Sequence, residues 1–225
     1  MSRRAGSGGP GRRSRPSTYT TFGSGPRELT FSDQEIKDLL IAWAALGVAF
    51  ALFLGGGAGA ITSGRFGTLL IVSIVTAGVG FLLHELAHKV VAVKFGQIAE
   101  FRADYPMLGL AILSGMAGFI FAAPGAVYHR GRITKEQHGL IAVAGPVTNL
   151  ALVVAFVPLI LIPVGVIQLI GVYGVIINAF LAAFNMIPFG PLDGKTVIEW
   201  NKGVFATVFL VSVGLTVLSF VIFLL

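Results

Sequence analysis

The long uncharged stretches of this chain restrict its fold more than any other feature. No residue between positions 139 and 192 carries a charged side chain. At about 20 residues per crossing, this length predicts two membrane-spanning helices joined by a tight turn near Pro163. Over the whole chain, hydrophobic residues make up 55% and charged residues only 12%, against roughly 25% charged residues in soluble domains. The sequence therefore predicts a multi-pass protein of the cell membrane, with the lipid bilayer as its surroundings.

Four further apolar runs lie outside this stretch, and three of them predict ordinary membrane spans. Ser32, followed three residues later by Glu35, is typical of a helix start and predicts the beginning of the first helix. The three runs cover residues 39–54, 68–94 and 204–225. Together with the uncharged stretch, they predict an all-α fold with about five transmembrane helices.

The fourth run, residues 107–128, is ambiguous. It is uncharged and exceeds the roughly 20 residues that a crossing needs. Three glycines and the Pro124–Gly125 pair interrupt it, which is unusual in a continuous helix. Hydropathy by itself therefore does not decide whether this run crosses the membrane.

The N-terminal residues 1–29 differ in composition from the rest of the chain. They are rich in Gly, Ser and Pro and contain six arginines with a single glutamate. Such a segment cannot bury enough apolar surface to fold, and it lacks the hydrophobic core of a signal peptide. Contact with RNA or anionic lipid is one interpretation. We favour a disordered, basic cytoplasmic tail that helps to fix the topology, and expect no nucleic acid as a partner.

The residues best suited to chemistry centre on the sequence His84-Glu85-Leu-Ala-His88. Residues four apart lie one turn above each other on a helix, so both histidines can bind one metal ion, as in the H-E-x-x-H sites that zinc favours. Glu85 lies beside them, where a carboxylate can take a proton from a water molecule at the metal. The alternative is a helix end with solvated polar residues, which the apolar surroundings disfavour. The chain has no cysteine, so thiolate ligands and disulfides are excluded.

Two histidines need a third protein ligand to form an open catalytic zinc site. Asp193 ends the second span of the uncharged stretch, among prolines and glycines that must unwind the helix there. An ionisable side chain at membrane depth is costly unless it is paired or bound to a metal. The sequence therefore predicts Asp193 as the third ligand. The alternative is that Asp193 marks the aqueous boundary after the helix.

Three motifs, in this order, resemble the site-2 protease family of intramembrane zinc metalloproteases. They are the His-Glu-x-x-His motif, the segment Gly145-Pro-Val-Thr-Asn149, and Asn185-x-x-Pro-x-x-Pro-Leu-Asp193-Gly. The resemblance covers about residues 68–194 and implies a site-2 protease-like core.

The resemblance also implies roles for individual residues. It implies one zinc ion per chain, held by His84, His88 and Asp193, with Glu85 as the catalytic base. For Asn149 it implies a part in binding the substrate strand or the developing oxyanion. A hydrogen bond between helices is the alternative role for Asn149.

Metal coordination limits how the spans can be oriented. Asp193 must lie at the depth of the two histidines, so the spans that carry them must run in the same direction, with one return crossing between them. Residues 107–128 should then be re-entrant, with Tyr105 and His129 both on the cytoplasmic side. This segment is longer and more hydrophobic than its counterpart in the family. With the N-terminus inside, the scheme leaves only Arg65 of the sixteen Lys and Arg residues outside, as the positive-inside rule asks.

The predicted organisation has four parts: the tail 1–29, a first transmembrane helix and loop 30–66, a catalytic membrane core 67–202, and a C-terminal transmembrane helix 203–225. The predicted function is zinc-dependent hydrolysis of peptide bonds in or near transmembrane segments of membrane-protein substrates. A non-proteolytic transporter or inactive scaffold that uses the buried His/Glu/Asp cluster is the alternative, because broken helices are typical of transporters. The sequence does not indicate an oligomeric state.

Overall fold

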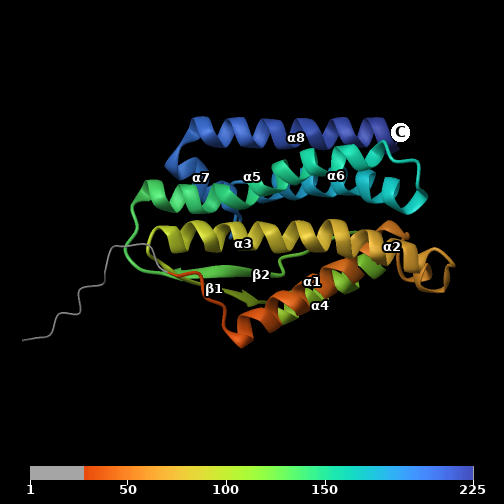
Figure 1. The fold of residues 1–225 in the computed structure, drawn as a ribbon, viewed down its shortest axis with the longest axis horizontal. Coiled ribbons are helices and arrows are strands. Elements are labelled where there is room, and N and C mark those ends of the chain that lie inside the picture. The colour runs from red at the N-terminus through yellow and green to blue at the C-terminus, as the bar shows by residue number, and fades with distance from the viewer. Residues whose placement is uncertain (1–27, 225) are drawn as a thin grey trace, which may run out of the picture.

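The computed structural model describes residues 28–224 (Figure 1). The predicted tail, residues 1–29, therefore lies almost entirely outside the described residues. Five described helices are long and apolar enough to cross a bilayer, which confirms the expectation of a mainly helical, multi-pass architecture. They are α1 (Asp33–Leu54), the continuous helix formed by α2 (Phe66–Ser73), η2 (Ile74–Gly78) and α3 (Val79–Lys94), α5 (Lys135–Ile160), α6 (Gly165–Asn185) and α8 (Lys202–Leu224).

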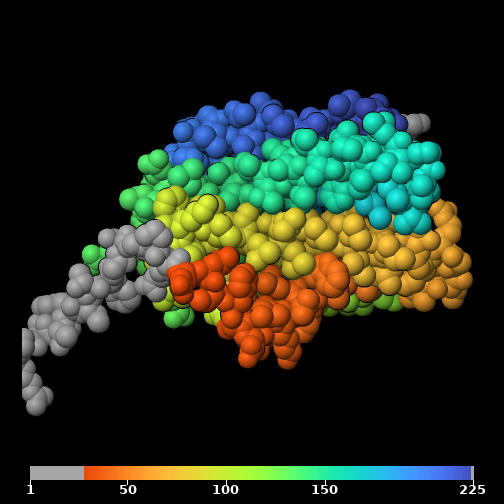
Figure 2. Space-filling model, viewed as in Figure 1, coloured from red at the N-terminus to blue at the C-terminus, as the bar shows by residue number. Residues whose placement is uncertain are grey.

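The helices form layers around α3, the helix that carries the His-Glu-x-x-His motif. In Figure 1, α5, α6 and α8 lie on one side of α3, whereas α1, α4 and the strands lie on the other. Figure 2 shows their side chains as adjoining bands in the same order, with α8 at the upper edge and α1 at the lower edge. The motif therefore lies in the interior of the bundle.

One wide turn interrupts the long helix ahead of the motif. Ile74–Gly78 has the hydrogen-bond pattern of a π-helix, which leaves backbone carbonyls without their usual partners. Trp43 of α1 donates its indole N–H to the carbonyl of Ile74 at 3.2 Å. This hydrogen bond stabilises the wide turn. The extra residue in the turn rotates the side chains of α3 about the helix axis relative to those of α2.

The prediction of an all-α fold was wrong in one region, where two strands form an antiparallel sheet. β1 (Ile98–Ala103) pairs with β2 (Gly125–Arg130), with Ala103 opposite Gly125 and Ile98 opposite Arg130. Side chains along β2 alternate between half-buried and exposed, a period-2 pattern. The hydropathy of residues 107–128 concealed this pattern, because the strand begins inside the apolar run.

The ambiguous run, residues 107–128, is not one continuous helix. It consists of α4 (Tyr105–Met116), a turn at Gly118 with a positive φ of 83°, and the start of β2. α4 has 12 residues, which corresponds to about 18 Å and is short of the about 30 Å of a bilayer core. Because Ala103 pairs with Gly125, the two ends of this segment lie side by side.

The chain unwinds after α6, as the prolines and glycines predicted. α6 ends at Asn185, and residues 186–192 form turns with a positive φ of 61° at Gly190. A short helix that was not predicted, α7 (Asp193–Trp200), begins at the aspartate. This change of direction brings Asp193 back against α3 and α5.

Candidate metal centre

The structure brings together three side chains that the sequence predicted as metal ligands. His84 and His88 lie on α3, and Asp193 is the first residue of α7. The Asp193 Oδ2 atom lies 3.2 Å from His84 Nε2 and 3.4 Å from His88 Nε2. The three potential ligand atoms lie within 4.8 Å of one another, and this group could hold a metal ion.

The geometry of these atoms fits a tetrahedral zinc site. Ligands bound at the usual 2.0–2.2 Å in a tetrahedron lie about 3.3–3.6 Å apart, close to the two separations from Asp193 Oδ2. Gly145 of α5 faces the same space. A Cβ atom at this position would lie 2.5 Å from His84 Nε2 and 2.6 Å from His88 Nε2. The absence of a side chain at Gly145 therefore leaves room beside both imidazole nitrogens.

Both imidazoles are oriented by hydrogen bonds at their second nitrogen. His88 Nδ1 lies 2.7 Å from the backbone carbonyl of Ile141, which can only accept, so Nδ1 carries a proton and Nε2 is the nitrogen that can bind a metal ion. His84 Nδ1 lies 2.6 Å from Asn149 Oδ1. Partners of this kind fix the tautomer and ring orientation of histidines that bind metals.

Asn149 is fully buried and makes hydrogen bonds between helices. Besides its contact with His84, its Nδ2 donates to the Gly80 carbonyl at 3.2 Å and to Asn178 Oδ1 at 2.9 Å. These are the contacts of the helix–helix alternative for Asn149. Asn149 does not line the cavity beside the metal group, which is described in the next paragraph. No contact of Asn149 therefore reaches the space in which a substrate could bind.

A cavity of about 290 Å³ opens at the metal group. Glu85 lines it beside His84 and His88, and residues of α1, α3, α6 and β2 supply apolar walls. Glu85 lies next to the ligands without belonging to the group of three. This placement puts its carboxylate at the cavity, where it also reaches the backbone N–H of Val127 on β2.

Two further histidines at this cavity were missed by the sequence reasoning. His129 of β2 and His138 of α5 also line it, with ring centroids 5.5 Å apart. Burial, the neighbouring His138 and the nearby His88 lower the pKa of His129. No spacing in the sequence signals this pair. The only available hint was that the chain contains just four histidines, all of which line the cavity.

The Asp193 carboxylate is held in its charged form. Burial by itself would raise its pKa, but in the metal-free protein the imidazoles of His88 and His84, in their protonated forms, outweigh this effect and hold the pKa below the usual value. With a side chain that is 17% exposed, Asp193 is also within reach of the cavity. It can therefore offer an anionic oxygen at neutral pH.

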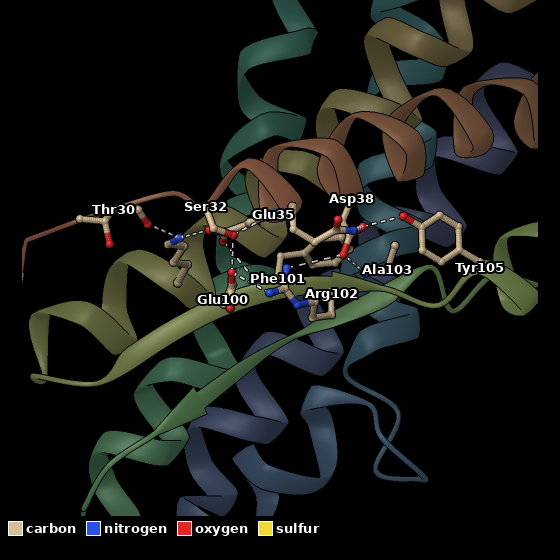
Figure 3. A network of polar contacts seen from close by, with 11 residues as sticks. Thr30, Ser32, Glu35, Asp38, Glu100, Phe101, Arg102, Ala103 and Tyr105 are labelled. Carbon is tan, nitrogen blue, oxygen red and sulfur yellow. Dashed lines mark hydrogen bonds and ion pairs between the residues drawn. The ribbon is translucent and has the colours of Figure 1, made fainter.

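A buried ion pair next to the ligands was also missed by the sequence reasoning. Lys89, the residue after His88, forms an ion pair with Glu35 of α1, and both side chains are only 1% exposed. Figure 3 shows the network around Glu35, which joins the start of α1 to β1. Ser32 does cap α1 by accepting the Glu35 N–H. The Glu35 carboxylate, however, accepts the N–H of Phe101 at 3.0 Å instead of returning to Ser32.

Comparisons with known proteins identify relatives over most of the chain. A protein of Methanocaldococcus jannaschii named "Putative zinc metalloprotease MJ0611" is 42% identical over 189 residues, which cover 82% of this chain and 93% of the relative. A protein of Bacillus subtilis named "Putative zinc metalloprotease YwhC" is 32% identical over 152 residues, which cover 59% of this chain and 69% of the relative. No model of a protein family and no solved structure matches the chain. The identity to the archaeal relative over nearly its full length, together with the assembled His/His/Asp group, shows that the chain belongs to the same family of zinc metalloproteases as these two proteins.

Proposed function

We propose that this chain is an intramembrane zinc metalloprotease of the site-2 type. Its substrates would be membrane proteins, cut at peptide bonds in or near their transmembrane segments. The observation that carries the proposal is the position of Glu85, which lines a cavity beside His84, His88 and Asp193 among helices apolar enough to span a bilayer.

The roles of the residues follow from the donor atoms they present. His84, His88 and Asp193 would hold one zinc ion, which supplies a Lewis acid that acidifies water and polarises a carbonyl group. Glu85 accepts the proton of the attacking water and delivers it to the leaving nitrogen of the cleaved peptide bond. The cavity, with His129 and His138 among its lining residues, holds the water that the reaction consumes.

The sheet supports a way of holding the substrate. Phe101 of β1 donates its N–H to Glu35, away from β2. Its partner Val127 therefore belongs to a pair without mutual hydrogen bonds, and the Val127 backbone groups point away from β1. Val127 lines the same cavity as Glu85. An extended peptide can add to such an edge through backbone hydrogen bonds, so a helical substrate would unwind before cleavage.

The opposite edge of the sheet is less accessible. Besides Glu35, Asp38 of α1 accepts the N–H of Ala103 at 3.3 Å. These two carboxylates accept hydrogen bonds from alternate N–H groups of β1. A peptide binding at this edge would have to displace them. The β2 edge at the cavity is the edge at which we propose the substrate binds.

The proposal includes the orientation in the membrane. The N-terminus and residues Tyr105 and His129 would face the cytoplasm, and residues 104–124 would dip into the bilayer and return. The pairing of Ala103 with Gly125 supports this arrangement, because both ends of the segment lie together.

The test of the proposal is a comparison of the wild type with Glu85→Gln. The variant should keep its zinc, since Glu85 is not one of the proposed ligands. It should lose cleavage by about 10²–10⁴-fold, the usual contribution of a general acid–base group. Zinc content of the purified protein and quantitative profiling of membrane proteins that accumulate uncut in cells provide the two measurements.

The same experiment separates the protease from a transporter. A transporter would leave the set of cleaved membrane proteins unchanged between wild type and variant. Cleavage at the wild-type rate by Glu85→Gln would contradict the proposed mechanism.

A further inference from the structure

Asn178 of α6 is a buried polar residue that takes no direct part in the proposed reaction. Its side chain is fully buried, and it does not line the cavity. Burying an amide is costly unless all its hydrogen-bonding groups have partners. Asn178 donates to the Gly174 carbonyl at 2.9 Å and accepts from Asn149 at 2.9 Å. It is thus the outer member of a chain of hydrogen bonds that ends at His84.

Backbone carbonyls determine the direction of every bond in this chain. The Gly174 carbonyl can only accept, so the Nδ2 side of Asn178 must face it and Oδ1 must face Asn149. Asn149 must then present its Nδ2 to Asn178, and the Gly80 carbonyl, again only an acceptor, requires the same orientation. Asn149 Oδ1 is left facing His84 Nδ1. An oxygen at this position requires a proton on Nδ1, so Nε2 is the nitrogen that can bind a metal ion.

The packing around Asn178 is built for this contact. A Cβ atom at Gly80 of α3 would lie 2.5 Å from Asn178 Oδ1. Only a glycine at position 80 therefore lets α6 bring its amide this close to α3 and α5. Without Asn178, the Asn149 amide would keep a single carbonyl partner at 3.2 Å to hold its direction.

We propose that Asn178 is a positioning residue that sets the tautomer of His84 through Asn149. The inference rests on the proposed zinc site, because the tautomer matters only if His84 Nε2 binds the metal. If the Asn149 amide reversed, an N–H group would face His84 Nδ1. The imidazole would then carry its proton on Nε2, where it cannot act as a ligand.

The test combines Asn178→Leu, which has a similar size and no amide, with a second change at Asn149. Asn178→Leu should weaken zinc binding by about 10–100-fold, the usual effect of losing an outer hydrogen-bond partner of a ligand. In an Asn149→Asp background the same change should alter zinc binding less than about threefold, because either carboxylate oxygen accepts from His84 whatever its orientation. Zinc affinity is measured by competition with a chelator.

Controls separate positioning from folding. Ser212→Ala removes a buried hydroxyl that bonds to Val208 within α8, far from His84 in the chain, and should leave zinc affinity unchanged. Thermal unfolding of the metal-free proteins shows whether each variant folds, and Asn178→Ala replaces the leucine variant if that one does not.

Nitrogen NMR of the His84 ring in metal-free protein reads the tautomer without any bound zinc. The wild type should show a proton on Nδ1, whatever the state of Nε2 beside Asp193, and Asn178→Leu should show less protonation of Nδ1. An equal loss of zinc affinity in both Asn149 backgrounds, or an unchanged tautomer, would overturn the positioning role. A wild type that binds no zinc but shows this tautomer shift would contradict the proposed function and leave the positioning role standing.

Discussion

Gly145 contributes no ligand atom, yet the space around the metal group depends on it. Replacing it by alanine would put a methyl group 2.5 Å from His84 Nε2, closer than real Cβ contacts. One imidazole must then move out of line with Asp193. The requirement at this position is one of shape and not of chemistry.

We therefore predict that Gly145→Ala loses most of its bound zinc while the helical bundle persists. Gly214→Ala is the matched control, because Gly214 also lies within a helix but has nothing within 4 Å of its Cβ position. Zinc content by elemental analysis and helix content by circular dichroism distinguish the two variants. Full zinc occupancy in Gly145→Ala would show that the metal is held elsewhere.

Asp193 is expected to act as the anionic ligand of the site. Asp193→Ala should lower zinc occupancy, since two neutral imidazoles would remain without a charged partner. Glu199→Ala is the control, because Glu199 lies on the same helix α7 with its side chain exposed. The measurement is the zinc content of the purified variants after dialysis. Stoichiometric zinc in Asp193→Ala would place the third ligand at another residue.

At the scale of elements, α1 is tied to α3 by a buried charge. The Lys89 ammonium contacts Glu35, donates to the Thr30 carbonyl at 2.6 Å and lies 3.9 Å from the Phe31 ring centroid. Glu35 in turn holds the backbone of β1. One pair of charges therefore connects the metal helix, the first span and the sheet.

Breaking this pair should be costly because it leaves a buried charge without a partner. We predict that Lys89→Met lowers the free energy of unfolding by about 3–5 kcal/mol. The double variant Glu35→Gln/Lys89→Met should recover a large part of this loss, since no buried charge remains. Denaturant unfolding in detergent measures both.

The matched surface pair is formed by Arg102 and Glu100, 2.8 Å apart and each more than a third exposed. Glu100→Gln should cost at most about 1 kcal/mol, because water screens exposed charges. If Glu100→Gln and Lys89→Met lowered the free energy of unfolding by similar amounts, burial would not be what makes the Lys89–Glu35 pair costly to break.

At the scale of the whole molecule, the proposed topology depends on the return of residues 104–124. We predict that Tyr105 and the exposed Tyr128, the neighbour of His129, face the same side of the membrane. Ser63, in the loop between α1 and α2, should face the opposite side. All three are exposed, and the chain contains no cysteine. Single cysteines at these positions can therefore be labelled with an impermeant thiol reagent in oriented vesicles.

Labelling of Tyr105→Cys and Tyr128→Cys from opposite sides would contradict the re-entrant segment. It would also conflict with the antiparallel pairing of β1 and β2, which brings these two regions together. A shared side for Ser63→Cys and Tyr105→Cys would instead contradict the direction proposed for α1.

The sequence by itself predicted the mainly helical character of the protein, its long apolar helices and the three residues of its candidate metal group. These follow from local signals: the length of uncharged runs is compared directly with the thickness of a bilayer, and the four-residue spacing of His84 and His88 acts through a single helix. Asp193 could be singled out because a carboxylate at membrane depth is costly without a partner. These inferences need no knowledge of how distant segments pack.

Only the tertiary structure decided the sheet, the network of asparagines and the buried ion pair. β1 and β2 are short, and the free edge of β1 is completed by Glu35 and Asp38 from a helix more than 60 residues away in the sequence. Glu35 lies three residues after Ser32, the spacing of a capping box. Its carboxylate nevertheless bonds to Lys89 and to the N–H of Phe101. The same holds for His129, His138 and Asn178. Their partners lie on other elements, so their roles arise from packing, which no local pattern of residues encodes.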